Sequence, residues 1–144
     1  MNSTFVIAIA LVGGVAIAVQ AQFAGVLDSR MGALDAVAVS FVSAGVVMAA
    51  IRLASGNLDP TVWRGAPWWA YLVGVLALVI VGSIGFATVR IGLVPTLATV
   101  TVAQFSTGAL IAHFGWFDGA RDPIDLQTVA GLVLLCVGGW LVIR

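Results

Sequence analysis

Five long stretches of the sequence are almost free of charge, and this feature limits the folds open to the chain more than any other. They run from about Thr4 to Ala24, Leu34 to Leu53, Trp68 to Val89, Gly92 to His113 and Leu126 to Ile143. Each approaches the length of about 20 mostly apolar residues that an α-helix needs to cross the hydrocarbon core of a bilayer. We therefore predict an all-α integral membrane protein whose five transmembrane helices form a single domain over residues 1–144.

The composition agrees with lipid, rather than water, as the solvent of this chain. Hydrophobic residues make up 62% of it and charged residues 8%, whereas about a quarter of the residues of a soluble domain are charged. The six basic residues are all Arg, the six acidic residues are all Asp, and the formal net charge is zero. Because no basic patch is available to neutralise phosphates, we expect the lipid bilayer, and no nucleic acid, as a partner.

Polar segments separate the five stretches. Asp28, Ser29 and Arg30 are expected to form a turn after the first helix, and the segment from Ser55 to Pro60 is expected to form a loop after the second. The connection from Phe114 to Asp125 is rich in charged residues and must reach water. Asp125 also has the side chain and the position to cap the last helix.

Aromatic residues gather at the expected helix ends, as in an interfacial belt. Trp116 and Trp140 lie near two of these ends, and a denser cluster precedes the third helix: Trp63, Trp68, Trp69 and Tyr71. The favoured interpretation is anchoring at the membrane surface, with Trp68 and Trp69 beside the entrance of any substrate pathway. Direct contact with a substrate is the alternative.

Small residues recur at helical spacing within the stretches. In lipid, apolar side chains gain little by meeting each other, so close backbone approach along small residues holds helices together. A smooth wall beside a substrate path is the alternative interpretation. The candidate packing glycines are Gly14, Gly74, Gly82, Gly108, Gly131 and Gly139.

Uncharged polar residues within the stretches are the candidates for a binding site. An amide in hydrocarbon is costly without a partner, so Gln20 and Gln104 should face the protein interior or a water-filled cavity. Gln104, Gly108 and Ala112 share one helical face, and Ser40 adds a hydroxyl in the second helix. Structural hydrogen bonding between helices and contact with a substrate both remain open. No nucleophile and base pairing, cofactor motif or metal-ligand spacing is visible, so we predict no enzyme, cofactor or metal.

The arginines do not specify an orientation. With five crossings, one side of the membrane receives Arg52, Arg64 and Arg121, and the other receives Arg30, Arg90 and Arg144. Orientation is normally set by an excess of Lys and Arg on the cytoplasmic side. Either a count of this kind misses a marginal bias, or copies insert both ways and pair as an antiparallel homodimer.

Short motifs are spread over nearly the whole chain. They are Gln20 with Leu27, Ser40-Phe41 with Gly45, Pro67-Trp68-Trp69 with Gly74, Arg90-Ile91-Gly92, Gln104, His113-Phe114-Gly115 with Gly119, and Gly131 with Gly138. Their order and spacing resemble the YdcZ-type small integral membrane proteins of the drug/metabolite transporter superfamily. The chain departs from that pattern at Ala24, where an Asn is expected, at Ala103, where a Gly is expected, and at Ala112, where an acid is expected.

The resemblance implies a five-helix unit that equals half of a ten-helix transporter with inverted repeats. Because five is odd, two copies reproduce the inverted arrangement only in opposite orientations, with the substrate site near the midplane. The expected function is export of a small molecule across a bacterial inner membrane, by alternating access, as a homodimer or with a paired homologous subunit. The alternative, favoured by the departures from the pattern, is a non-transporting subunit that stabilises a larger membrane complex.

Overall fold

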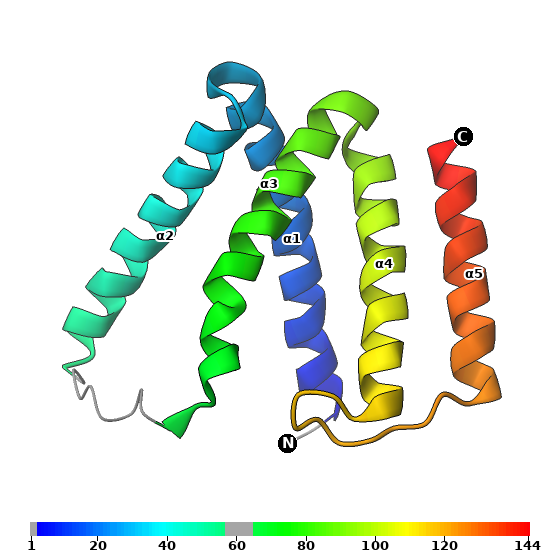
Figure 1. Ribbon diagram of the computed structural model, residues 1–144. Coiled ribbons are helices and arrows are strands. Elements are labelled where there is room, and N and C mark those ends of the chain that lie inside the picture. Colours follow the sequence, from blue (N-terminus) through cyan, green and yellow to red (C-terminus); the bar gives the residue numbers. More distant parts are fainter. Residues whose placement is uncertain (1–2, 57–64) are drawn as a thin grey trace. The chain divides into compact units, whose positions relative to one another are not determined.

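The computed structural model describes residues 3–56 and 65–144, and these residues form helices without any strand. In chain order the helices are α1 (Ser3–Met31), α2 (Ala33–Ala54), the 3-10 helix η2 (Trp68–Leu72), α3 (Val73–Ile91), α4 (Leu93–Phe114) and α5 (Leu126–Ile143) (Figure 1). Counting η2 with α3, five helical spans in this part of the chain are long and apolar enough to cross a membrane. The predicted all-α membrane architecture is confirmed.

The predicted turn at Asp28, Ser29 and Arg30 is wrong. α1 continues through all three residues, and the Ser29 hydroxyl donates a 2.8 Å hydrogen bond to the carbonyl of Val26 in the same helix. A polar triplet does not interrupt a helix when its side chains can reach water or the helix's own carbonyl groups. The chain turns only at Gly32, where φ is +85°, a backbone conformation that residues with a Cβ rarely adopt.

The other helix ends lie close to their predicted positions. The third stretch begins after Pro67 as predicted, but its first residues form the 3-10 helix η2 before the α-helical part. The predicted cap of the last helix is confirmed, because Oδ1 of Asp125 accepts hydrogen bonds from the amide of Thr128 at 2.7 Å and from its hydroxyl at 2.6 Å. The latter part of the predicted loop after α2, with Trp63 and Arg64, lies outside the described residues.

The chain divides into two compact units, residues 1–89 and 90–144. In the first unit, α1 and α2 meet at the turn and diverge away from it (Figure 1). α3 crosses α1 so closely that the two glycines at the crossing have no room for a side chain. A Cβ on Gly85 would lie 3.3 Å from the carbonyl oxygen of Ala24, and a Cβ on Gly25 would lie 2.8 Å from Cγ2 of Thr88. Ala24 and Ile84 are buried at this crossing, so it is the core of the first unit.

The second unit is built on α4 and α5, which lie side by side and antiparallel (Figure 1). Their close contact is at Gly139, where an added Cβ would lie 3.0 Å from Cγ2 of Val102. The segment that connects the end of α4 to the start of α5 also lies within this unit. This pair of helices therefore has its own packing seam.

A repeat that the sequence analysis missed relates the two helix junctions of the chain. Gly25, Arg30 and Gly32 recur in the same spacing as Gly85, Arg90 and Gly92. The two turning glycines have nearly identical backbone angles, with φ and ψ of 85° and 161° at Gly32 and of 86° and 163° at Gly92. The residue four positions after each turn is also buried in both copies. Each junction is thus the same helix, glycine, helix motif.

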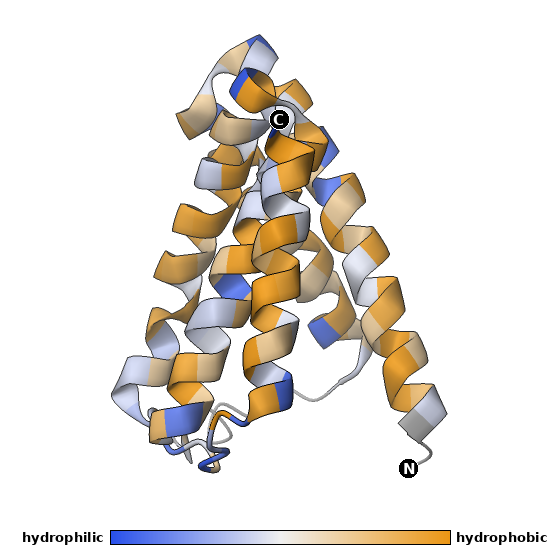
Figure 2. Ribbon diagram, turned by 90° about the vertical axis from the view of Figure 1, so that its right-hand side faces the viewer, coloured by the Kyte–Doolittle hydropathy of each residue, from blue (hydrophilic) through white to orange (hydrophobic). Residues whose placement is uncertain are grey.

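The surface of the helices is apolar around most of their circumference. In the view of Figure 2, hydrophobic residues cover most of each helix, and hydrophilic residues gather mainly at the helix ends and in the connections. Large side chains such as Leu34 and Leu134 are exposed by 88% and 71%. A helix that is hydrophobic all round belongs in lipid or against other helices. The exterior of this chain therefore faces hydrocarbon or another protein.

Candidate functional site

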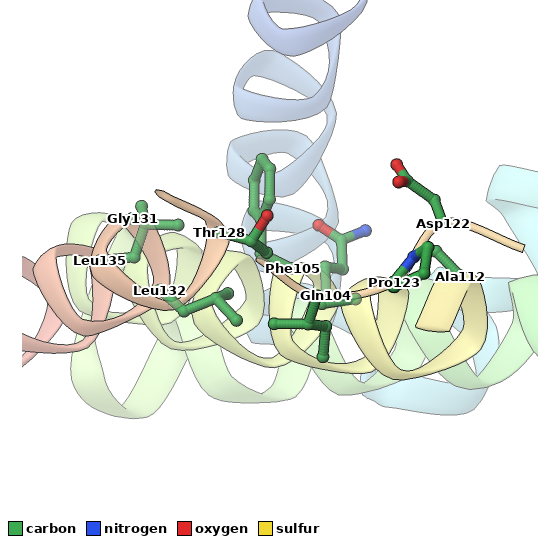
Figure 3. A pocket seen from close by; sticks show the side chains of 12 residues that line it. Gln104, Phe105, Ala112, Asp122, Pro123, Thr128, Gly131, Leu132 and Leu135 are labelled. Atoms are coloured by element: carbon green, nitrogen blue, oxygen red, sulfur yellow. The ribbon is translucent and has the colours of Figure 1, made fainter. Parts of the chain in front are cut away.

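A groove of about 650 Å³ runs between α4 and α5 within the second unit. Its walls are apolar, with Phe105 on α4 and Leu132 and Leu135 on α5 (Figure 3). Polar side chains line it at three places: Gln104 on α4, Asp122 in the connecting segment and Thr128 on α5. A concave apolar surface with a few polar groups has the composition of a site for a small molecule.

Gln104 brings an unpaired amide into this groove. Its side chain is exposed, and within the described part of the chain no hydrogen bond reaches it. Gly108 and Ala112, which share its helical face, line the same groove, so a ligand could lie directly on the backbone beside the amide. Leaving an amide without a hydrogen-bond partner in an apolar environment costs several kcal/mol on hydrocarbon transfer scales, about 4–8 kcal/mol. The amide therefore favours an occupant that offers hydrogen bonds.

The connecting segment after α4 is fixed by hydrogen bonds to the end of that helix. The amide of Asp122 donates to the carbonyl of Ala112 at 2.9 Å, and Nε of Arg121 donates to the carbonyl of His113 at 3.2 Å. Nδ1 of His113 accepts the amide hydrogen of Ile124 at 3.1 Å. The first two bonds satisfy carbonyl groups at the end of α4, where a helix leaves such groups without partners. They also hold the Asp122 carboxylate at the mouth of the groove.

A second groove, of about 580 Å³, lies between α1 and α2 within the first unit. Gln20 and Ser40, predicted together as site residues, both line it. The Ser40 hydroxyl donates to the carbonyl of Ala36 at 2.8 Å, so its hydrogen is already used inside α2. The amide of Gln20 is exposed and has no hydrogen bond among the described residues, as with Gln104. The three predicted residues are thus divided between two grooves, one in each unit.

Trp68 and Trp69, the predicted entrance residues, begin η2 and line neither groove. Trp68 is exposed by 77% and Trp69 is half-buried. A tryptophan at the end of a membrane helix with its ring exposed has the position of an interfacial anchor. Their place at the start of the third span agrees with anchoring.

The predicted packing glycines fall into two groups. Gly82 and Gly139 lie against neighbouring helices, since an added Cβ would come within 3.4 Å of Val37 in one case and 3.0 Å of Val102 in the other. The others have nothing within 4 Å of that point in the described part of the chain: Gly14, Gly74, Gly108 and Gly131. A packing role for this second group needs a partner chain, and it stays a prediction.

Sequence reasoning missed the residues at the crossing of α1 and α3. Gly25 and Gly85 make closer approaches than most of the glycines predicted for packing, and the Oγ1 atom of Thr88 beside them is buried without a hydrogen bond. The repeated spacing of glycine and arginine could have found this crossing, because both glycines occupy the same place in the two copies.

Comparison with known proteins places nearly the whole chain in one family. Residues 5–141 match the family described as "Putative inner membrane exporter, YdcZ". No curated protein and no solved structure gave a match. The match extends over all five apolar spans, from α1 into the end of α5. The chain therefore belongs to this YdcZ family of the drug/metabolite transporter group, and it is a multi-pass protein of the inner membrane.

Proposed function

We propose that this chain exports a small molecule by alternating access, with Gln104 contacting the substrate in the groove between α4 and α5, and with Gln20 and Ser40 as contacts in the separate groove between α1 and α2. The observation that carries the proposal is the groove between α4 and α5, in which apolar walls surround the unpaired amide of Gln104. Such a surface can hold a partly apolar molecule by contact area and orient it by hydrogen bonds.

The depth of the two amides supports this assignment. About 18 Å of helix separates Gln20 from the turn at Gly32, and the same length separates Gln104 from the turn at Gly92. Because the hydrocarbon core is about 30 Å thick, this distance supports a position of both amides near the middle of a membrane. Substrate sites of secondary transporters lie near the midplane, where either side can be opened in turn.

An antiparallel homodimer is part of the same proposal. Three arginines fall on each side of the membrane, so the chain carries no charge bias toward one orientation. Two copies of a five-helix unit form an inverted pair only when they insert in opposite directions. The open glycines Gly14 and Gly74 offer small surfaces for such a partner, which could also be a homologous subunit.

The test of transport is flux into liposomes that contain the purified chain. Four labelled probes cover the main chemical classes: N-methyl-4-phenylpyridinium, biphenyl-4-carboxylate, leucine and xylose. We expect at least one probe to move faster than in protein-free liposomes, and Gln104→Leu to slow that flux about tenfold. Gln127→Leu makes the same chemical change outside the groove, so it should transport like the wild type.

The result decides between transport and the alternative function. If no probe moves faster than in protein-free liposomes, the chain acts as a non-transporting subunit of a larger complex. If a probe moves but Gln104→Leu and Gln127→Leu behave alike, the groove is not the site. Native mass spectrometry in lipid tests the dimer separately, since a monomer or a larger mixed assembly would contradict it.

A further inference from the structure

We propose that the groove between α4 and α5 recognises a lipophilic organic cation, with Asp122 facing the positive charge. This inference rests on the proposed export function and names the class of its substrate. The charge of the groove is the starting point, because Asp122 is the one charged residue among those that line it in the described part of the chain. Its end is therefore negative while its walls are apolar.

Nothing in the described residues neutralises this carboxylate. No hydrogen bond or ion pair reaches its oxygen atoms there, although its own backbone amide is bonded to Ala112. The nearest basic residue in sequence, Arg121, uses Nε to bond the carbonyl of His113. A negative group without a partner at the edge of a low-dielectric region attracts a cation and repels an anion. The groove is thus complementary in charge to a cation.

The backbone that carries this carboxylate is held in place beside the groove. Its backbone is tied to the end of α4 by the bond from Asp122 to Ala112, and the bond between Ile124 and His113 holds the next turn of the segment. In Figure 3 the Asp122 carboxylate and the Gln104 amide extend to the same side, with Ala112 beside the former. A ligand lying in the groove can therefore meet both groups.

The apolar lining of the groove sets the character of the cation. From Gln104 to Ala112, to which Asp122 is bonded, α4 rises about 12 Å. Phe105, exposed by 57%, and the apolar side chains of Leu132 and Leu135 on α5 line the same groove. A fitting ligand has a cationic end that faces Asp122 and an apolar or aromatic body that contacts these side chains.

Three rod-shaped probes of similar size but different charge test the inference. N-methyl-4-phenylpyridinium is a permanent cation, 4-phenylpyridine is neutral in mildly alkaline buffer, and biphenyl-4-carboxylate is an anion. Equilibrium binding to the purified chain in lipid nanodiscs, with empty nanodiscs subtracted, should show the cation bound at least about tenfold more tightly than either other probe. Equal binding of the three probes, or tighter binding of the anion or the neutral rod, would overturn the assignment of a cation site.

A pair of matched variants locates the charge that the cation meets. Asp122→Asn should weaken binding of the cation about tenfold and leave binding of 4-phenylpyridine unchanged. Asp118→Asn removes the same charge from the same connecting segment without touching the groove, so it should bind the cation like the wild type. Equal losses in both variants would show attraction by the surface as a whole and would contradict the site.

Failure of this inference and failure of the export function give different results. If the liposomes transport biphenyl-4-carboxylate, leucine or xylose but not the cation, the chain is an exporter and the cation site is wrong. If no probe moves but the cation binds and requires Asp122, the site stands and the chain does not transport. Melting of the Asp122→Asn protein at the temperature of the wild type keeps a loss of binding distinct from a loss of fold.

Discussion

The crossing of α1 and α3 gives the sharpest prediction about what holds the first unit together. In Gly25→Ala, the new methyl group would lie 2.8 Å from Cγ2 of Thr88 and 3.2 Å from its Cβ. Rotation of the Thr88 side chain can move Cγ2, but Cβ can move only with the helix backbone. The substitution therefore forces α1 and α3 apart.

The expected loss follows from a comparison within α1. Overpacking a well-packed contact costs about 1–3 kcal/mol, while replacing glycine by alanine in a helix returns about 1 kcal/mol. Gly13→Ala gains the same helix preference, and nothing in the described part of the chain lies within 4 Å of its new Cβ. Subtracting the stability of Gly25→Ala from that of Gly13→Ala cancels the helix preference of alanine. The remaining difference in the free energy of unfolding, about 2 kcal/mol, is the cost of the crowded contact with Thr88.

The assay is unfolding of the purified chain by a denaturing detergent, followed by circular dichroism. Gly25→Ala should be less stable than Gly13→Ala by about 2 kcal/mol. Adding Thr88→Ala to Gly25→Ala should recover part of the loss, because it removes Cγ2 and also a buried hydroxyl without a hydrogen bond. Equal stabilities of the two alanine variants, or no coupling with position 88, would refute a close crossing of these helices.

Two further predictions concern the segment between α4 and α5. His113→Leu removes the acceptor of the Ile124 amide hydrogen and should lower the free energy of unfolding by about 1 kcal/mol. His113→Asn can place an oxygen near the position of Nδ1, so its loss of stability should be smaller. Unfolding in a denaturing detergent compares the two variants. The side-chain and backbone hydrogen bonds from Thr128 hold the pKa of Asp125 below its ordinary value. Their stabilisation is present at neutral pH and is lost as the pH falls through the lowered pKa, so the melting temperature of Asp125→Asn should fall less on acidification than that of the wild type.

The helices could be predicted from the sequence because a single cost dominates their formation. Backbone and charged groups in hydrocarbon are so unfavourable that apolar stretches of membrane length must become helices. The ends were harder to predict, since a helix ends where a particular backbone angle or cap allows it. The capping role of Asp125 can be predicted because it depends only on residues next to it in sequence. The residues from Asp28 to Arg30 have the composition of a turn, but the turn itself is at Gly32.

The candidate site could be predicted in part for a similar reason. Gln104, Gly108 and Ala112 are neighbours along one helix face, so helical geometry alone brings them into one groove. Asp122 could not be assigned to that groove from sequence, because its position depends on the segment folding back onto Ala112 and His113. Contacts of this kind need the three-dimensional path of the chain.

The amides of α1 extend the argument for a partner chain. Gln20 and Gln22 are two residues apart, so they point to nearly opposite faces of the helix, and a single groove cannot receive both. Gln20 lines the groove toward α2, whereas Gln22 is exposed outside both grooves and has no hydrogen bond among the described residues. An amide at this depth is costly in lipid. The face of α1 that carries Gln22 is therefore better suited to another protein surface than to hydrocarbon, as the proposed dimer requires.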